Sequence, residues 1–153
     1  NLKPILDDYI EERRPLLGIC LGMQMLFESS DEFGYSEGIG YIEGHVKKLE
    51  RKIKLPHISW NEIRPKNIEW GNTILDNINF RTDFYFIHSF VPHPKNINHI
   101  LSLTNYHDKE FCSSVKKDNI YGTQFHPEKS GSQGIKIMSN FISICKKYKN
   151  ARK

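Results

Sequence analysis

The sequence has no apolar run long enough to cross a membrane. The longest such runs, for example residues 84–87, are only a few residues long, whereas a membrane-spanning helix needs about 20 predominantly apolar residues. Residues 1–14 are acidic and amphipathic, and they lack the basic start and apolar centre of a secretory signal. We therefore expect a cytoplasmic protein that makes no contact with a membrane.

Repeats, low-complexity blocks and Gly/Ser linkers are also missing from the sequence. The 153 residues fall within the size range of one domain, and 38% of them are hydrophobic, which excludes a disordered chain. We therefore expect residues 1–153 to form a single domain.

Cysteine is scarce, because only Cys20, Cys112 and Cys145 occur, and no two of them have the C-x-x-C spacing. This pattern excludes a disulfide framework and a zinc ribbon. We expect neither a metal nor another cofactor, and we expect Cys112 and Cys145 only to pack against their neighbours.

The net charge of +4 is distributed unevenly. Residues 1–45 carry nine acidic and three basic side chains, whereas residues 46–153 carry nine acidic and 19 basic ones. The basic side chains are scattered except for a cluster near the C-terminal end, which consists of Lys146, Lys147, Lys149, Arg152 and Lys153. A solvated basic tail explains this cluster best. A surface for an anionic partner or a phosphate-bearing substrate is the alternative, and nucleic-acid binding is not expected.

The spacing of apolar residues predicts an α/β fold. A helix is expected over residues 4–15, followed by a buried strand over residues 16–19 and a second helix over residues 23–28. A final amphipathic helix is expected from Gly134 onward. Strands are expected in between, at residues 41–49, 60–64, 84–88, 100–106, 111–117 and 120–125. The pattern predicts a sheet covered by helices, with an antiparallel portion in the middle of the chain.

The most informative segment, residues 18–22, reads Gly-Ile-Cys-Leu-Gly. A buried strand runs directly into a helix there, with a glycine two residues before and after Cys20, which is the pattern of a nucleophile elbow. The helix N-terminus after Cys20 is expected to lower the pKa of the thiol, and the Leu21 N–H could face an oxyanion. These features favour acyl transfer over the alternative that Cys20 is a small buried hydrophobic residue.

A second segment, residues 122–131, reads Gly-Thr-Gln-Phe-His-Pro-Glu-Lys-Ser-Gly. His126 and Glu128 are two residues apart, so they point to the same face of extended backbone. Glu128 could hold one imidazole nitrogen of His126 while the other nitrogen faces a nucleophile. A solvated strand end would explain an isolated His-Pro-Glu, but together with the elbow the segment indicates a Cys-His-Glu triad.

With these two segments the chain resembles the class I (triad) glutamine amidotransferases. Within that family it is most similar to the glutaminase subunits of imidazole glycerol phosphate synthase, which acts in histidine biosynthesis. Three further segments support the resemblance, namely residues 26–32 (Leu-Phe-Glu-Ser-Ser-Asp-Glu), 56–61 (Pro-His-Ile-Ser-Trp-Asn) and 84–90 (Phe-Tyr-Phe-Ile-His-Ser-Phe). The resemblance implies a flavodoxin-like α/β fold with a mostly parallel central sheet and flanking helices.

The resemblance also assigns catalytic roles. Cys20 would attack the side-chain amide of glutamine and form a γ-glutamyl thioester, which water hydrolyses to glutamate. His126 would take the thiol proton and deliver one to the departing ammonia, and Glu128 would orient His126. The backbone N–H of Leu21 would donate to the oxyanion.

The same resemblance implies a substrate pocket. Gln24 and Glu32 would contact the amino-acid end of glutamine, and the backbone of Ser89 and Phe90 would complete the pocket. Phe90 stands where the family usually has tyrosine, and a backbone contact should survive the loss of the hydroxyl.

A protein partner is implied as well. In the family, ammonia passes to a cyclase with a (β/α)₈-barrel fold, which is the synthase half of a heterodimer with lyase activity. Trp60, Asn61, Tyr85 and Lys129 fall where the resemblance places the contact with that barrel. For Trp60, filling the core is the alternative, because tryptophan is common both in cores and at interfaces.

Three alternative functions keep parts of this interpretation. A paralogous subunit could supply ammonia for the amidation of bacterial surface sugars together with a cyclase-like protein. A non-catalytic binding module could have kept the fold but lost activity, although such modules usually lose a triad member and all three are present here. A cysteine protease or thioesterase could use the same triad geometry, but the extended sequence match disfavours it.

One family feature was not found in the sequence. Family members begin with a strand, a helix and a further strand that leads into a Pro-Gly-x-Gly loop, which supplies a second oxyanion donor. Losing one such donor costs about 100- to 1,000-fold in rate. We therefore expect residues 1–153 to be the C-terminal part of a longer protein, poorly stable and nearly inactive on their own.

Overall fold

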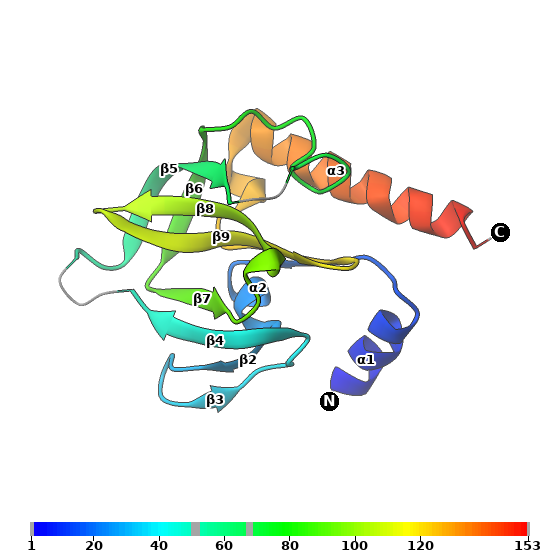
Figure 1. The fold of residues 1–153 in the computed structure, drawn as a ribbon, viewed down its shortest axis with the longest axis horizontal. Helices are drawn as coiled ribbons and strands as arrows, with labels where there is room; N and C mark the ends of the chain where they lie inside the picture. Colours follow the sequence, from blue (N-terminus) through cyan, green and yellow to red (C-terminus); the bar gives the residue numbers. More distant parts are fainter. Residues whose placement is uncertain (1, 50–52, 67–68, 153) are drawn as a thin grey trace.

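The structure, a computed structural model, describes residues 2–49, 53–66 and 69–152. Figure 1 shows its helices and strands in chain order. They are α1 (Lys3–Glu11), β1 (Leu16–Ile19), α2 (Leu21–Met25), β2 (Phe27–Ser30), β3 (Ser36–Glu37), β4 (Ile42–Lys48), β5 (His57–Pro65), β6 (Thr82–His88), β7 (Phe90–Pro94), the 3₁₀ helix η1 (Ile97–His99), β8 (Ile100–Tyr106), β9 (Lys109–Lys117), β10 (Ile120–Thr123), the 3₁₀ helix η2 (Pro127–Lys129) and α3 (Gly131–Asn150). The expected α/β class is confirmed.

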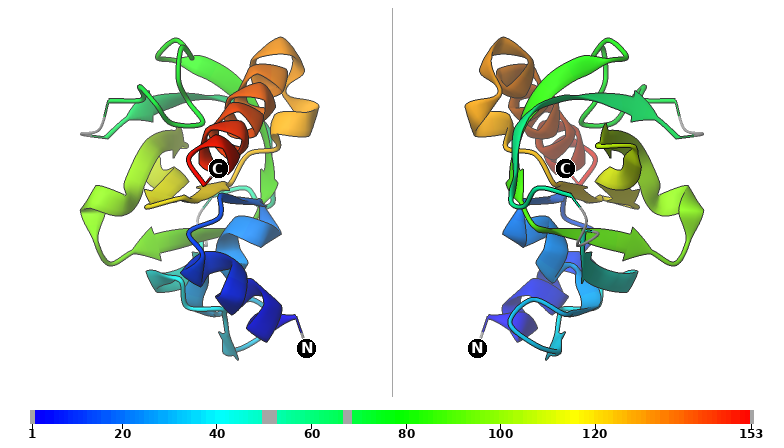
Figure 2. Two further views of the ribbon diagram at one scale, coloured as in Figure 1. Left: turned by 90° about the vertical axis from the view of Figure 1, so that its right-hand side faces the viewer. Right: turned by 90° about the vertical axis from the view of Figure 1, so that its left-hand side faces the viewer.

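The strands form two sheets. A six-stranded sheet has the order β1-β10-β9-β8-β5-β6, and a four-stranded sheet has the order β3-β2-β4-β7. Figure 2 shows the six-stranded sheet curling beside α3, with the four-stranded sheet below it. The last residues of β6 and the first of β7 are separated only by Ser89, so the chain passes from one sheet directly into the other.

The expectation of a mostly parallel sheet is wrong for the described residues. Only the pairs β1–β10 and β2–β4 are parallel among them, and the other pairs are antiparallel. The reason is the length of the connections. His107 and Asp108, both with positive φ (46° and 59°), join β8 to β9, and two-residue turns of this kind reverse the chain and produce antiparallel neighbours.

The expected helix over residues 23–28 is wrong in its second half. Helix α2 ends at Met25, and β2 begins at Phe27. The backbone carbonyl groups there accept hydrogen bonds from a distant segment, since Gly40 N donates to Phe27 O (3.0 Å) and Ile42 N donates to Leu26 O (2.9 Å). Pairing with residues 38–42 therefore replaces the helical hydrogen bonds that the local spacing favours.

Two apolar clusters hold the elements together. The larger lies between the six-stranded sheet and α3, where Ile137 packs with Phe84, Phe86 and Phe125. The smaller is built around Met23, Leu26, Phe27, Ile42 and Val46, and it joins α2 to the four-stranded sheet. Helix α1 buries no side chain. No helix among the described residues is both long and apolar enough to span a membrane.

Candidate functional site

Cys20 lies on a sharp turn between β1 and α2, as the sequence predicts. Its backbone has φ 50° and ψ −106°, a strained conformation for a residue that is not glycine. A Cβ added at Gly18 would lie 2.5 Å from the Gly22 carbonyl oxygen, so this turn requires glycine at position 18. A Cβ added at Gly22 would meet no described atom within 4 Å, so the same steric requirement does not hold there.

The pairing of β1 with β10 brings the two predicted segments together. The strands are parallel, with Ile19 opposite Thr123, and the Cys20 N–H donates to the Thr123 carbonyl at 2.7 Å. The carboxyl ends of both strands therefore lie at the same edge of the sheet. This edge is where open α/β sheets place their ligands, and it carries both Cys20 and His126.

His126 and Glu128 form the predicted pair. His126 Nδ1 lies 2.6 Å from Glu128 Oε1, and His126 Nε2 is buried with no hydrogen-bond partner among the described residues. The His126 backbone is held from two sides, because its N–H donates to the Tyr85 carbonyl at 2.9 Å and its carbonyl accepts from Ser130 Oγ at 2.6 Å. The carboxylate thus occupies one imidazole nitrogen and leaves the other available for a proton.

The Cys20 sulfur lies between a donor and an acceptor. Gln124 Nε2 donates to it at 3.6 Å, and its own thiol points to the Ile87 carbonyl at 3.9 Å. Burial raises the pKa of the Cys20 thiol, although the Leu21 N–H and the Gln124 amide act in the opposite direction. The expected lowering by the helix N-terminus is present through the Leu21 N–H, but desolvation is the larger effect and the pKa is raised overall. The carboxylates of Glu32 and Glu128 raise the pKa further.

A hollow of about 290 Å³ lies beside the elbow, close to the lower limit of about 300 Å³ for small-molecule pockets. Leu21, Gln24 and Glu32, three of the predicted site residues, line it together with Met25 and Phe33. The structure thus brings the predicted substrate-binding side chains next to the nucleophile, and the electrostatic effect of Glu32 on Cys20 agrees with this placement.

Gln24 is more constrained than the sequence indicates. Only 7% of it is exposed, and its Nε2 donates both to the Phe90 carbonyl (3.0 Å) and to Gln124 Oε1 (3.1 Å). Since Gln124 in turn donates to the Cys20 sulfur, two buried amides connect the Phe90 backbone with the nucleophile. Gln124 lies inside the His-Pro-Glu segment but was not selected from the sequence, because only its contacts reveal a role.

Ser89 and Phe90, the predicted backbone contacts, lie where the chain passes from β6 to β7. The Ser89 carbonyl accepts a hydrogen bond from the Leu49 N–H at 2.9 Å. The Phe90 carbonyl accepts from Gln24 and also from His88 Nδ1, at 3.1 Å. Phe90 is therefore brought to the wall of the hollow through Gln24.

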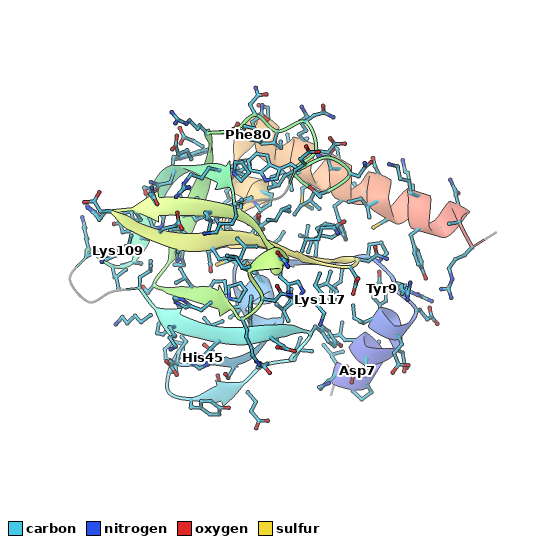
Figure 3. All side chains as sticks on the ribbon, in the orientation of Figure 1. Asp7, Tyr9, His45, Phe80, Lys109 and Lys117 are labelled. Atoms are coloured by element: carbon cyan, nitrogen blue, oxygen red, sulfur yellow. The ribbon has the colours of Figure 1, made fainter. Side chains whose placement is uncertain are left out.

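A histidine that sequence reasoning missed supports the segment that carries Glu32. His45 on β4, labelled in Figure 3, lies 2.5 Å from Ser29 Oγ through Nδ1 and 2.8 Å from Asp31 Oδ1 through Nε2. The Glu32 N–H then donates to Ser30 Oγ at 3.1 Å. The residues directly before Glu32 are thus tied to β4 of the four-stranded sheet. No local pattern marks His45, because its partners lie on another strand.

The four predicted interface residues do not share one face. Trp60 is opposite Tyr85 in the β5–β6 pair, with ring centroids 6.0 Å apart, and Lys129 Nζ lies 5.9 Å from the Tyr85 ring centre. Trp60 is 52% exposed, which excludes the alternative that it fills the core. Asn61, by contrast, makes its hydrogen bonds with His57 and Ser59, which alternate with Trp60 along β5 and so face the other side of the strand.

A larger hollow, of about 500 Å³, lies at the opposite end of the strands. Pro15, Asp118 and Asn119 line it together with residues of α3 such as Asn140. Pro15 precedes β1 and Asn119 precedes β10, so this hollow opens at the amino ends of the two strands whose carboxyl ends carry Cys20 and His126. It therefore plays no part in the candidate site.

Cys112 and Cys145 do not line the hollow beside the elbow. Cys112 is 4% exposed in the smaller apolar cluster, and burial raises the pKa of its thiol. Cys145 lies partly buried on α3. In the part of the chain that the structure describes, no group of three or more His, Cys, Asp or Glu side chains is placed to hold a metal ion.

Sequence comparison identifies relatives of this chain. Residues 1–145 match the family model "Glutamine amidotransferase class-I". The chain is 40% identical over 151 residues to "Imidazole glycerol phosphate synthase subunit HisH 1" of Legionella pneumophila (strain Lens), and 42% identical over 143 residues to the HisH subunit of Methanocaldococcus jannaschii; each match covers 94% of this chain and 70% of the relative. A HisH 2 subunit of Methanococcus maripaludis is 45% identical over 135 residues, which cover 87% of this chain and 64% of the relative.

Solved structures show the same fold. PurLQS from Thermotoga maritima has a TM-score of 0.70 at 16% identity, covering 94% of this chain and 68% of the other. A glutamine amidotransferase from Thermotoga maritima has a TM-score of 0.58 at 16% identity, covering 96% and 55%. The family match over most of the chain and the relatives at 40% identity or more agree with the Cys20, His126 and Glu128 geometry, and the chain therefore belongs to the class-I glutamine amidotransferases.

Proposed function

We propose that this protein is the glutaminase subunit of an imidazole glycerol phosphate synthase, hydrolysing glutamine to glutamate and ammonia. The observation that carries the proposal is the strained Cys20 elbow at the same sheet edge as the His126–Glu128 pair. The names of the relatives, which are HisH subunits of that synthase, supply the pathway. We place the reaction in the cytoplasm, where thiols such as Cys20 stay reduced.

The reaction begins with proton transfer from the Cys20 thiol to the buried His126 Nε2, which has no competing partner among the described residues. The thiolate then attacks the side-chain carbonyl carbon of glutamine, and the Leu21 N–H donates to the developing oxyanion. The imidazolium returns its proton to the leaving nitrogen, so ammonia departs and a γ-glutamyl thioester remains. Water, deprotonated by His126, hydrolyses the thioester to glutamate.

Glu128 and Gln124 act through the two reacting groups. The Glu128 carboxylate accepts a hydrogen bond from His126 Nδ1, so the lone pair of the neutral ring lies on Nε2 and points away from Glu128. The same carboxylate stabilises the imidazolium that forms after proton transfer. The Gln124 amide donates to the Cys20 sulfur and so stabilises the thiolate against the cost of burial. The two effects favour the state in which Cys20 is a thiolate and His126 is an imidazolium.

The hollow beside the elbow would hold the rest of the substrate. The half-buried Glu32 carboxylate supplies a negative charge for the α-ammonium group of glutamine. Gln24 lines the hollow and would help orient the side-chain amide toward Cys20, and the backbone of Phe90 supports Gln24 from behind. We assign the backbone of Ser89 and Phe90 to completing the pocket once glutamine is bound. Because Gln24 already donates to Phe90 and Gln124, we assign it to shaping the pocket as well as to contacting the substrate.

We assign the exposed face of the β5–β6 pair to the cyclase partner, a (β/α)₈-barrel protein with which this chain would form a heterodimer. Ile58 (53% exposed) lies opposite Ile87 (39%), and Trp60 lies opposite Tyr85, so four apolar or aromatic side chains are adjacent. Lys129 adds a positive charge at the edge of this face. The Ile87 carbonyl faces the Cys20 thiol from the same strand, which supports a short route for ammonia into the partner.

The test uses the full-length protein with its cyclase partner. Cys20→Ala should abolish glutamine-dependent turnover of the complex and leave the ammonia-dependent reaction of the partner unchanged. A glutamine-like electrophile should label Cys20 stoichiometrically. Cys145→Ala is the matched control, because it removes a thiol from α3 and should leave both activities and the labelling unchanged. Wild-type protein that never releases glutamate, with or without the partner and its substrate, would overturn the proposal.

A further inference from the structure

Two buried histidines outside the triad form a continuous hydrogen-bonded chain with the glutamine pocket. His57 is 0% exposed and His88 is 7% exposed. His88 Nδ1 lies 3.1 Å from the Phe90 carbonyl, His88 Nε2 lies 3.0 Å from His57 Nδ1, and His57 Nε2 lies 2.7 Å from Asn61 Oδ1. The chain thus begins at the Phe90 carbonyl, which also accepts from the pocket-lining Gln24, and ends on β5, one residue from the exposed Trp60.

Both ends of this chain are oxygen acceptors. At one end the Phe90 carbonyl can only accept. At the other end Asn61 Nδ2 donates to the Asn105 carbonyl at 3.2 Å, which turns the amide oxygen toward His57. Ser59 Oγ lies within hydrogen-bonding distance of both, 2.9 Å from His57 Nε2 and 2.5 Å from Asn61 Oδ1.

The hydrogen-bonded histidine chain has one proton fewer than its contacts require. Three contacts involve the ring nitrogens, namely from Phe90 to His88, from His88 to His57, and from His57 to Asn61, and each needs one proton. Two neutral imidazoles carry two N–H groups. Burial keeps both rings neutral near pH 7, since it lowers the pKa of His88 to about 3 and also lowers that of His57. One of the three contacts therefore always lacks a proton.

A proton missing from the central contact would leave two nitrogen lone pairs facing each other at 3.0 Å, which is repulsive. Two arrangements remain, and they differ in which end contact lacks the proton. In the first, both rings carry the proton on Nδ1, so His88 donates to the Phe90 carbonyl and Ser59 donates to the bare His57 Nε2. In the second, both rings carry it on Nε2, so His57 donates to Asn61 and the bare His88 Nδ1 faces the Phe90 carbonyl. The exchange moves one proton between the rings, releases one from His88 Nδ1 to water and takes one up at His57 Nε2, so the pair keeps two ring protons.

We propose that His57 and His88 form a tautomeric relay through which the hydrogen bonding of Asn61 on β5 sets whether the Phe90 carbonyl receives a second donor besides the pocket-lining Gln24. The consequence reaches the nucleophile through the two amides. The Phe90 carbonyl also accepts from Gln24, which donates to Gln124, which donates to the Cys20 sulfur. A bare nitrogen at His88 Nδ1 repels the carbonyl oxygen and shifts the Gln24 contact.

The relay connects the opposite side of β5 from the proposed partner face with the glutaminase site. Any change that removes the Asn61 amide from His57, including a shift of β5 when a partner binds its Trp60 face, removes the acceptor at that end of the chain and so favours the first arrangement. This regulatory consequence rests on the proposed glutaminase function, whereas the coupling between Asn61 and His88 does not. His57 and His88 are positioning residues, because they act on the substrate pocket through Phe90 and Gln24.

The test uses two uncharged substitutions with opposite expected signs in the full-length protein. Asn61→Ala removes the acceptor beside His57 and should shift His88 toward protonation on Nδ1. Ser59→Ala removes the donor that satisfies a bare His57 Nε2 and should shift His88 toward a bare Nδ1. Ring ¹⁵N chemical shifts, which distinguish protonated from bare nitrogens, report the state of each ring. Glu62→Ala, on the exposed face of the same strand, is the matched control and should leave both rings unchanged.

The kinetic readout separates the relay from general destabilisation. The KM for glutamine should differ by about five-fold between Asn61→Ala and Ser59→Ala, the effect of one neutral hydrogen bond. In a His88→Asn background the two substitutions should lose this difference, because the link to Phe90 no longer changes its protonation. Identical His88 nitrogen shifts in the two variants, or a KM difference that persists in the His88→Asn background, would overturn the relay.

The two proposals fail differently. If the ring nitrogens respond as expected but no variant turns over glutamine, the glutaminase function is wrong and the coupling stands. If glutamine is hydrolysed but the nitrogen shifts of His88 ignore Asn61 and Ser59, the relay is wrong and the glutaminase function stands.

Discussion

Histidines occur in two clusters near the candidate site, and the clusters differ in the groups that their rings face. The first cluster is His126 with Glu128, and the second is the pair His57 and His88. His126 faces the Glu128 carboxylate at 2.6 Å, and its side chain is 19% exposed. His57 and His88 face each other and neutral oxygen acceptors, and both are buried. The first cluster can hold a positive charge next to its carboxylate, whereas burial keeps the second cluster neutral.

This difference separates the chemistry from the positioning. The Glu128 carboxylate can stabilise a positive charge on the His126 ring, as the proposed general base requires. The neutral His57–His88 pair is a poor acceptor for the Cys20 proton, but either nitrogen of each ring can carry the N–H that donates. The same residue type therefore serves proton transfer in one cluster and hydrogen-bond geometry in the other, because the neighbouring groups set the charge.

The largest expected effect is on the charged cluster. His126→Asn should lower kcat for glutamine hydrolysis by about 100- to 10,000-fold, because the general base is lost. Stability should change by less than about 0.5 kcal/mol, since the His126 backbone bonds to Tyr85 and Ser130 remain. Steady-state kinetics and urea unfolding measure the two quantities. A variant with wild-type kcat would contradict the role of His126.

The neutral cluster should show the opposite balance. His57→Leu leaves His88 Nε2 and Asn61 Oδ1 without His57 and should lower the free energy of unfolding by about 1–3 kcal/mol. Its kcat should fall far less than that of His126→Asn. Urea unfolding measures the loss of stability. His93→Leu, at an exposed position on β7, is the matched control and should be nearly neutral; equal losses in the two variants would contradict this interpretation.

The pH dependence of stability should also separate the clusters. His88 has a folded pKa of about 3, below its usual value of 6.5. Between these two pH values the unfolded chain binds a proton at His88 that the folded protein does not bind. The stability due to the neutral ring is fully present above pH 6.5 and is lost as the pH falls toward 3, with a slope of up to about 1.4 kcal/mol per pH unit. Burial is the main cause of both lowered pKa values, and the titratable neighbours that lower them further are His57 and His126 for His88, and His107 for His57.

Urea unfolding of wild type and His88→Asn at pH 7 and pH 5 measures this slope. Asparagine keeps a donor near the Phe90 carbonyl but does not titrate, so the variant should lose less stability between the two pH values. A variant whose stability falls as steeply as that of wild type would show that another group is responsible.

The smallest effect is expected at His45, on β4. His45→Gln removes its contact with Asp31, whose side chain is 52% exposed, so the KM for glutamine should rise about two- to five-fold with kcat unchanged. The reason is that Glu32 follows Asp31 directly in the pocket wall. Lys95→Gln, which breaks an exposed ion pair with Glu43, is the matched control. If both variants raised KM equally, His45 would have no specific role.

The sequence predicted the position of the strands more successfully than their pairing. The expected strands from 41–49 to 120–125 all occur, with shifted ends, and the final helix begins at Gly131. The mostly parallel sheet was wrong, because short turns such as His107-Asp108 reverse the chain. The helix over 23–28 was wrong, because Phe27 pairs with a distant segment. Turn geometry and long-range pairing cannot be read from the spacing of apolar residues.

The interface residues illustrate the same limit. Trp60 and Asn61 were predicted together because they adjoin in the sequence, yet successive residues of a strand point to opposite faces. Trp60 is exposed next to Tyr85, whereas Asn61 bonds to His57. Whether Asn61 contacts the partner directly stays a prediction.

The sequence by itself predicted the nucleophile, its base and the orienting carboxylate, because each prediction depends on spacing within a few residues: a glycine two positions before Cys20, and His126 two positions before Glu128. Only the tertiary structure decided that Gln24 meets Gln124, 100 positions away, and that His57 meets His88, 31 positions away. Local spacing sets the direction of a side chain, but strand order and register choose its neighbour. The hydrogen bonds between these neighbours therefore depend on the fold and not on local spacing.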